Sequence, residues 1–519
     1  MSNYGVIKDL FNHYLELLKS NNLEFFKNLD YYFDKLPRTN INIKNLDFVR
    51  KLHWMEVCNK FKNPYNPEAT SKIIEYLNED VIPGIKRIWY SIYNSRVDLK
   101  EAFPDIRNNE EARKKFIKWV FDSAKREYNL HDIFLESSNL NKVLLKENIG
   151  VNLFGYFTID IGMTIGAKRY LNLLKLLGIP YVIINVPAGF HKQSINNFLK
   201  FNKWFAKKPI YSINIIVVNA DQIDVVNEIY NYRGNTSYTI AEWAWEIENY
   251  FPFDKSYDYV DEIWYPSDFV VNTISKFAKK PVKKIPLFQI PDWNKILPKD
   301  EVRSQLGLSN NDYVFLFSFD FYSSFHRKNP DGVIKAFKNA FPKNIKNVKL
   351  ILKTSHGEYF PKEFNYIKNI SSDDERIIII DNIFTRDEYI SLLNACDAFI
   401  SLHRSEGLGY NILEAMLLAK PVIATKYGGN LEFCIEQTSL LVDYVITEIK
   451  EDFGPYKKGC LWAEPDLDKA SFFMQYLYEN KDFGKELGLK AKQHLSEMYS
   501  KNLVEWMVIF RDIFNKIYK

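Results

Sequence analysis

Residues 401–433 read SLHRSEGLGYNILEAMLLAKPVIATKYGGNLEF. The stretch begins at the end of an apolar run, DAFISL (397–402), which predicts a buried strand, and continues through the loop HRSEGLG. Helical spacing starts at about Tyr410, and the apolar run PVIAT (421–425) predicts the next strand. Strands that alternate with helices in this way are typical of a parallel sheet covered on both faces, so this unit indicates an α/β fold.

The same alternation extends toward the N-terminus and divides into two sets of strands. The predicted strands are 151–160, 180–187, 213–219 and 262–267 in one set, and 312–319, 348–354, 376–381, 397–402 and 421–425 in the other. A proline-containing segment, KKIPLFQIPDWNKILP (283–298), joins the two sets. Two such lobes face each other across a cleft, where ligands bind at the carboxyl ends of parallel strands.

The chain therefore has four expected segments. Before the first predicted strand, apolar residues recur at three- and four-residue spacing, which predicts helices. We expect a helical N-terminal extension (1–148), a first lobe on the acceptor side (149–295), a second lobe on the donor side (296–480), and a pair of C-terminal helices that pack back toward the first lobe (481–519).

Composition excludes some classes of function and location. A net charge of +4 is too mild to indicate a nucleic-acid partner. Four cysteines lie far apart without metal-binding spacing, which predicts free thiols in a reducing compartment. The N-terminus lacks the apolar core of a signal peptide, and no apolar stretch is long enough to cross a bilayer. We therefore expect a cytoplasmic protein.

Contact with the inner face of the membrane stays open. The basic run ARKKFIKWVFDSAKR (112–126) has the composition of a helix that lies on anionic lipid. The alternative is an ordinary solvated helix face, which charged runs more often form.

Two glutamates mark the loop and helix of the opening stretch. Glu406 lies in the loop and Glu414 about one turn into the helix, so both can face the cleft. Gly407 and Gly409 allow the backbone to approach a ligand closely, and the amide groups at a helix start bind anions. The alternative is that both glutamates are solvated residues at a helix start, where acidic side chains are favoured anyway.

The strand, glycine loop, helix and following Gly-Gly turn carry a family resemblance. Glu406 and Glu414 enclose seven residues, and this E-x7-E arrangement resembles bacterial glycosyltransferases of the retaining GT4 type. The resemblance covers roughly residues 150–519. It implies the GT-B fold, an α/β architecture of two Rossmann-like lobes, here with an N-terminal helical extension.

The resemblance also implies an activity. The protein would be a metal-independent hexosyltransferase without a cofactor, taking a sugar from a UDP- or GDP-linked donor. The acceptor would be a hydroxyl of a glycan or lipid-linked saccharide in the synthesis of cell-surface polysaccharide such as lipopolysaccharide. Two alternatives stay open: a non-catalytic GT-B partner subunit that binds glycan or a sister enzyme, and a nucleotide-sugar epimerase.

The family pattern assigns roles around the two glutamates. Glu414 would accept hydrogen bonds from the donor ribose, and Glu406 would contact the donor sugar near its reacting centre. Backbone amides of the loop would face the diphosphate. The other loop residues implied for donor binding are His403, Ser405, Gly407, Leu408 and Gly409.

A second cluster, FSFDFYSSFHRKNPDG (317–332), supplies the predicted cations. Charge builds on a nucleoside diphosphate as it leaves, and a fixed cation in a dry cleft stabilises it. Lys328 matches the family's lysine. The family's arginine normally lies further upstream, where this chain has Asp320 and Phe321, so Arg327 is the expected substitute. The alternative is a basic surface loop.

The remaining assignments are spread over both lobes. Ile383 and Phe384 follow a predicted strand where the family binds the base. Gly162 belongs to a glycine-rich turn of the first lobe, and Trp245 and Glu246 are assigned to the acceptor side. The pair Asp466 and Asp468 is interpreted as the capped start of a helix and not as a metal site.

Overall fold

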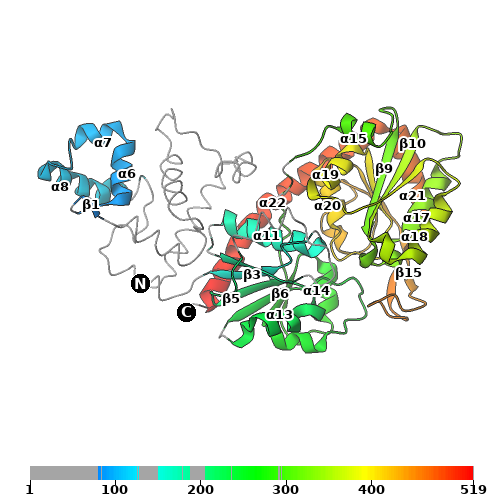
Figure 1. The fold of residues 1–519 in the computed structure, drawn as a ribbon, viewed down its shortest axis with the longest axis horizontal. Coiled ribbons are helices and arrows are strands. Elements are labelled where there is room, and N and C mark those ends of the chain that lie inside the picture. Colours follow the sequence, from blue (N-terminus) through cyan, green and yellow to red (C-terminus); the bar gives the residue numbers. More distant parts are fainter. Residues whose placement is uncertain are drawn as a thin grey trace.

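The computed structural model of the protein describes residues 80–124, 127, 150–187, 205–234, 237–289 and 291–517, apart from residues 83, 160, 178, 180, 292 and 294. The helices expected before residue 80 lie outside the described residues. Figure 1 shows two α/β lobes, with the long helix α22 running along both of them.

The first lobe is built on a six-stranded parallel sheet with the strand order β4-β3-β5-β6-β7-β8. Every residue of β3 and β5 is buried, which explains why these strands appear in the sequence as continuous apolar runs. The strands are β3 (Val151–Gly155), β4 (Tyr181–Asn185), β5 (Ile213–Val217), β6 (Tyr238–Glu242), β7 (Glu262–Tyr265) and β8 (Val282–Lys284). The α-helices are α11 (Gly162–Leu176), α13 (Ile223–Tyr230) and α14 (Asp268–Ser275), and the 3-10 segments are η4 (Ala220–Gln222), η5 (Tyr232–Gly234) and η6 (Asp254–Tyr259).

The second lobe has a six-stranded parallel sheet with the order β11-β10-β9-β12-β13-β14. Its strands are β9 (Tyr313–Asp320), β10 (Val348–Ser355), β11 (Ile377–Asp381), β12 (Ala398–Ser401), β13 (Val422–Thr425) and β14 (Leu440–Val442). The α-helices are α15 (Lys299–Gln305), α16 (Phe325–Lys328), α17 (Pro330–Ala340), α18 (Pro361–Ser371), α19 (Arg386–Ala395), α20 (Tyr410–Leu417) and α21 (Leu467–Glu479), and the 3-10 segments are η7 (Phe321–Ser323), η8 (Gly357–Tyr359) and η9 (Gly429–Glu432). A separate antiparallel hairpin consists of β15 (Tyr444–Glu448) and β16 (Leu461–Pro465).

Both sheets place the lobe's first strand inside the sheet, with later strands added on either side of it. This is the arrangement of Rossmann-like domains. The prediction of an α/β fold with two Rossmann-like lobes is therefore confirmed. The lobes also share one apolar cluster, in which Tyr265 and Val270 of the first lobe join Leu408 and Ile412 of the second.

The described part of the N-terminal extension has its own small core. It contains β1 (Asp80–Ile82), β2 (Ile85–Lys86), α6 (Arg87–Ser95), α7 (Val97–Ala102), α8 (Glu110–Trp119) and the π-helical turn η1 (Val120–Ala124). Its buried residues, among them Trp89 and Phe116, form a cluster without members from either lobe. Figure 1 draws this part apart from the two lobes. Within the described residues, no helix is long and apolar enough to cross a membrane.

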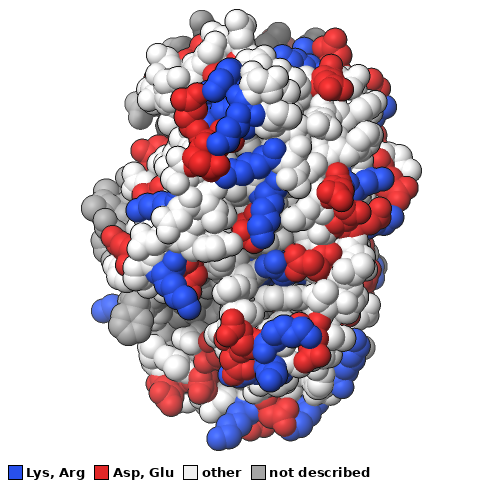
Figure 2. Space-filling view, turned by 90° about the vertical axis from the view of Figure 1, so that its right-hand side faces the viewer, with Lys and Arg blue, Asp and Glu red and all other residues white. Residues whose placement is uncertain are grey.

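The surface of the second lobe carries both signs of charge. On the face shown in Figure 2, basic and acidic side chains alternate over short distances. Several exposed pairs have this character, such as Lys346 with Glu375 at 3.2 Å and Lys338 with Asp373. Pairs this exposed contribute little to stability.

The C-terminal segment differs from the expected pair of helices. It is one helix, α22, which runs without a break from Lys481 to Ile517. Gly484 and Gly488 lie inside this helix and do not end it. Gly488 packs directly against the backbone that follows α20. The other half of α22 reaches the first lobe, where the Trp506 indole donates a 2.8 Å hydrogen bond to the Pro286 carbonyl.

Gly488 gives a direct test of this packing. A β-carbon at Gly488 would lie 2.0 Å from the Ala419 carbonyl oxygen, so Gly488→Ala should lower the free energy of unfolding by about 1–3 kcal/mol. Gly484→Ala in the same helix is the matched control, because its β-carbon would meet side chains alone, the nearest being the flexible Leu477 at 3.3 Å. Chemical denaturation should leave the control unchanged or up to about 1 kcal/mol more stable. Equal stability of the two variants would contradict the close contact.

Candidate functional site

The two central strands of the second sheet end beside each other. β9 is followed by α16, which carries Arg327 and Lys328, and β12 is followed by the loop that carries Glu406. The strand order reverses between β9 and β12, and a crevice forms at the carboxyl ends of strands at such a point. The fold thus brings together three residues that the sequence analysis predicted from separate segments.

Glu406 is buried and paired with both cations. The Lys328 ammonium forms an ion pair with one carboxylate oxygen, and Arg327 Nη1 lies 3.2 Å from the other. Burial alone would raise the pKa of Glu406, but the charges of Lys328 and Arg327 outweigh burial and lower that pKa to about 2. For Lys328 burial is the largest influence and lowers the pKa, with Glu406 opposing it. Glu406 is therefore an ionised hydrogen-bond acceptor and not a proton donor at neutral pH.

The Gly-Gly turn lies directly against this loop. The Gly429 amide donates a 2.7 Å hydrogen bond to the Glu406 carbonyl, and a β-carbon at Gly429 would lie 1.7 Å from the Gly407 carbonyl oxygen. Gly428 has φ +105°, and a β-carbon there would meet the Glu406 carbonyl oxygen at 2.7 Å. Only glycine fits both positions. The turn thereby fixes the backbone on either side of the Glu406 carboxylate.

Three consecutive backbone amides of this loop have no acceptor among the described residues. Gly407, Leu408 and Gly409 are buried, and their amides donate no hydrogen bond to any residue in the described part of the chain. Gly409, with φ +88°, is the N-cap of α20, so the three amides lie where the helix begins. Buried amides almost always have a partner, and a helix start with unbonded donors is an anion site.

The first lobe closes over the same loop. The Ser267 hydroxyl, which also caps α14, donates a 2.8 Å hydrogen bond to the Gly407 carbonyl. The Ser405 hydroxyl donates to the Glu246 carbonyl of the first lobe. Near the start of α20, a β-carbon added to Gly162 of the first lobe would lie 3.7 Å from the Tyr410 ring. Predicted residues of both lobes therefore meet at one loop.

Glu414 lies in α20 with 1% of its surface exposed. Its carboxylate forms an ion pair with an arginine that the sequence analysis missed. The Arg386 guanidinium binds both carboxylate oxygens of Glu414, with Nη1 at 3.0 Å from Oε2. Arg386 is the first residue of α19, next to the Thr385 cap. The only signal in the sequence was its place two residues after Phe384, close to the segment predicted to bind the base.

The segment predicted to hold a base is fixed by a buried lysine. Lys353 donates hydrogen bonds to the carbonyls of Asn382, at 2.6 Å, and Thr354, at 2.8 Å, and its ammonium lies 4.7 Å from the centre of the Phe384 ring. Burial lowers the pKa of Lys353 to about 8. Ile383, in contrast, is 46% exposed. The loop thus presents one apolar side chain to solvent on a rigid backbone.

Two residues that were predicted for the site have buried side chains packed inside the protein. His403 is fully buried, and both ring nitrogens are engaged, Nδ1 with the Ser401 hydroxyl at 2.9 Å and Nε2 with the Tyr427 carbonyl at 2.9 Å. These bonds give His403 a structural role, and its contact with a donor stays a prediction. Trp245 is buried among aromatic rings, and its indole donates to the Tyr250 carbonyl. Its neighbour Glu246 does reach the charged cluster, where one carboxylate oxygen lies 3.7 Å from Arg327 Nη2.

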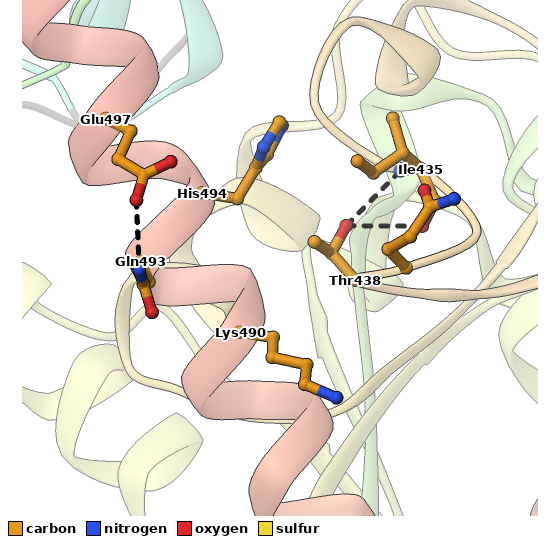
Figure 3. A pocket seen from close by; sticks show the side chains of 7 residues that line it. Ile435, Thr438, Lys490, Gln493, His494 and Glu497 are labelled. Atoms are coloured by element: carbon orange, nitrogen blue, oxygen red, sulfur yellow. Dashed lines mark hydrogen bonds between the residues drawn. The ribbon is translucent and has the colours of Figure 1, made fainter.

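Two further features lie outside the cluster. Asp466 caps α21 by accepting from the amides of Asp468 and Lys469, which confirms its interpretation as a helix cap. A shallow groove of about 260 Å³ lies between the segment after η9 and α22 (Figure 3), and no predicted site residue lines it. Its charged side chains come from α22, among them Lys490 and Glu497.

The comparisons with known proteins bear on the fold and on the second lobe. Residues 298–452 match the family model described as glycosyl transferases group 1, whereas no curated protein matches the chain. Sucrose-phosphate synthase from Thermosynechococcus elongatus is similar over 71% of this chain and 100% of its own, with 13% identity and a TM-score of 0.52. HepE from Anabaena, solved with UDP and glucose, is similar over 71% of this chain and 98% of its own, with 16% identity and a TM-score of 0.47.

These findings confirm the coarser part of the family prediction. The two lobes have the GT-B fold, and residues 298–452, in the second lobe, match the model of glycosyl transferases group 1. At 13% identity a structural likeness shows the fold alone. The chemistry therefore has to be argued from the residues at the crevice.

The pairing of Glu406 predicts a pH dependence of stability. Its pKa falls from 4.5 to about 2, which corresponds to roughly 3 kcal/mol, so Glu406→Gln should lower the free energy of unfolding by about that amount at pH 7. Because the folded-state pKa is the lower one, this contribution is complete above pH 4.5 and is lost as the pH falls toward 2.

Denaturation of both proteins between about pH 3 and pH 8 measures the difference. Glu436→Gln is the control, because Glu436 is an exposed glutamate paired only with Lys426 among the described residues. If the difference in free energy of unfolding between the wild type and Glu406→Gln does not shrink at low pH, the buried ion pair is contradicted.

Proposed function

We propose that this protein is a retaining, GT4-type glycosyltransferase that moves a hexose from a UDP- or GDP-linked donor to a hydroxyl of a glycan or lipid-linked saccharide. The reaction belongs to cell-surface polysaccharide synthesis and needs no metal ion. The observation that carries the proposal is the row of buried amides at Gly407, Leu408 and Gly409 beside Arg327 and Lys328. Hydrogen-bond donors and two cations at one strand end suit a diphosphate.

The charges account for departure of the diphosphate. When the bond between the anomeric carbon and the diphosphate oxygen breaks, negative charge builds on that oxygen. Lys328, Arg327 and the loop amides stabilise this charge, and their positions are fixed before the reaction begins. Positive charge from the protein takes the place of a metal ion.

The stereochemical course is taken from the family resemblance, and it requires no separate base. The acceptor hydroxyl attacks the anomeric carbon on the face from which the diphosphate leaves. Its proton passes to the departing phosphate oxygen as the new glycosidic bond forms, so the anomeric configuration is retained. Glu406, ionised at neutral pH, accepts hydrogen bonds from the donor sugar and takes no part in protonation.

Glu414 and Arg386 form the nucleoside end of the proposed site. The carboxylate of Glu414 accepts hydrogen bonds from the ribose hydroxyls. Arg386 holds that carboxylate through two nitrogens, which fixes its orientation before a donor arrives. The base lies against the segment that includes Ile383 and Phe384, where backbone groups recognise it.

Nucleotide binding is the first test. UDP, GDP, ADP and TDP are each added to the wild type, to Glu414→Ala and to Glu375→Ala, an exposed glutamate outside the site. One nucleotide should stabilise the wild type and Glu375→Ala, by about 2.7 kcal/mol at a hundred times its dissociation constant. Glu414→Ala should bind it roughly ten- to a hundredfold more weakly, since hydrogen bonds to a charged group are lost.

Each variant is compared with its own melting temperature without nucleotide, because Glu414→Ala also removes the partner of Arg386. If no nucleotide stabilises the wild type, the proposed donor site is wrong.

Lys328→Ala tests the role of charge in turnover. Release of nucleoside diphosphate from UDP- and GDP-hexoses, dependent on an added acceptor, should fall by about a hundredfold or more. Lys335→Ala on α17, an exposed lysine paired with Asp331, should retain wild-type turnover. The assay contains EDTA, so loss of wild-type activity under these conditions would contradict metal independence. Turnover of Lys328→Ala at the wild-type rate would refute the assignment of Lys328.

A further inference from the structure

The hairpin formed by β15 and β16 reaches from the second lobe to the first. Its strands pair from Tyr444 opposite Pro465 to Glu448 opposite Leu461. The connecting residues 449–460 form a compact tip, closed by reciprocal backbone hydrogen bonds between Phe453 and Tyr456. Most of the tip and all of β16 lie beyond the range that matches the family model. In Figure 1 the hairpin extends from one end of the second lobe.

The hairpin is firmly attached to the loop that carries Glu406. Arg404 binds the Glu464 carboxylate through two nitrogens, at 2.5 and 2.9 Å, and the Arg404 carbonyl accepts from the Ala463 amide. In the tip, Phe453 stacks on His326, with 3.7 Å between the ring centres. The tip therefore has a defined position relative to α16 and the Glu406 loop.

From this position the tip contacts the first lobe through polar groups. The Tyr456 hydroxyl donates a 3.0 Å hydrogen bond to one carboxylate oxygen of Glu246, and the Leu461 amide donates to the Asn249 side chain at 3.1 Å. Tyr456 is buried. Burial raises the pKa of Tyr456, so its hydroxyl stays protonated and keeps donating.

The same tyrosine covers Arg327. The guanidinium lies 5.9 Å from the centre of the Tyr456 ring, and its Nη2 is 3.7 Å from the second carboxylate oxygen of Glu246. Its Nη1 faces Glu406 and donates to the Ser405 carbonyl at 2.8 Å. The buried Nε of Arg327 has no partner among the described residues. Glu246 thus lies between the Tyr456 hydroxyl and the cation predicted to meet the diphosphate.

We propose that Tyr456 is a positioning residue for the transfer reaction: its hydroxyl holds the Glu246 carboxylate of the first lobe against Arg327, so that closure of the lobes orients this guanidinium. The proposal rests on the proposed function, because it assigns Arg327 to the leaving diphosphate. When the lobes separate, the Tyr456–Glu246 bond breaks and Arg327 loses its contact with the first lobe. A hydrogen bond to a carboxylate is among the stronger ones a tyrosine can make.

A purely structural role for Tyr456 makes a different prediction. The ring also packs 6.0 Å from the ring of Trp245, and that packing would survive removal of the hydroxyl. Tyr456→Phe keeps the ring, its packing and its contact with Arg327, and removes only the hydrogen bond to Glu246. The variant therefore separates positioning from packing.

Turnover and nucleotide binding are measured for the wild type, Tyr456→Phe, Glu246→Gln and the double variant, with UDP- and GDP-hexoses as donors and UDP and GDP as binding probes. Tyr456→Phe should lower kcat by about tenfold, the effect of one hydrogen bond to a charged group. The dissociation constants for UDP and GDP should change less than kcat does, since most of the groups assigned to nucleotide binding lie in the second lobe and do not depend on Tyr456. The double variant should lose no more than the stronger single variant, because both substitutions weaken the same chain of contacts from Tyr456 through Glu246 to Arg327.

Tyr257→Phe is the matched control. Tyr257 is a buried tyrosine of the first lobe whose hydroxyl has no hydrogen-bond partner among the described residues, so its removal should leave kcat unchanged. Wild-type kcat in Tyr456→Phe, or losses that multiply in the double variant, would overturn the role of Tyr456.

Lobe closure is measured separately by small-angle X-ray scattering. Closure appears as a decrease in the radius of gyration when UDP or GDP is added. The decrease should occur in the wild type and be smaller in Tyr456→Phe and Glu246→Gln. If the wild type transfers no sugar but closes in this way, the proposed function fails while the contact keeps its role. Equal closure in the wild type and Tyr456→Phe would overturn the role of Tyr456 whatever the activity.

Discussion

Arg327 and Glu406 lie buried, with the half-buried Lys328 beside them, where β9 and β12 end side by side. A charge removed from water is tolerated only when partners are held at close range, and losing one partner leaves the others uncompensated. Arg327 and Lys328 come from one segment and Glu406 from another, far along the chain. The two loops therefore have to keep one relative position. The other contacts at the crevice help to hold that position.

Glycine contacts hold the Glu406 loop from one side, and the first lobe holds it from the other. Gly428 and Gly429 bring a second turn into backbone contact with Glu406 and Gly407. The Ser267 hydroxyl then uses the Gly407 carbonyl as its acceptor. As a result the carbonyls of Glu406 and Gly407 are occupied, while the amides from Gly407 to Gly409 have no acceptor among the described residues. A backbone arranged in this way is ready for a negatively charged ligand.

Much of the fold could be predicted from the sequence, because its central strands are continuous apolar runs. β6 was missed, since its five residues, YTIAE, continue into an aromatic and acidic stretch without a turn signal. β15 was missed because its residues are largely exposed and show no buried run. The charged cluster was predicted from its glycine loop, but Arg386 was not, because an arginine at a helix start usually faces solvent. The inward turn of His403 depends on backbone geometry that neighbouring residues do not reveal.

The single helix α22 has a mechanical consequence for the two lobes. With 37 residues it is a rod about 55 Å long, attached to the second lobe at Gly488 and to the first at Trp506. A helix resists stretching, because extension breaks its hydrogen bonds in series. The lobes can therefore change their relative position only by bending or twisting this rod, which favours rotation over separation along its length.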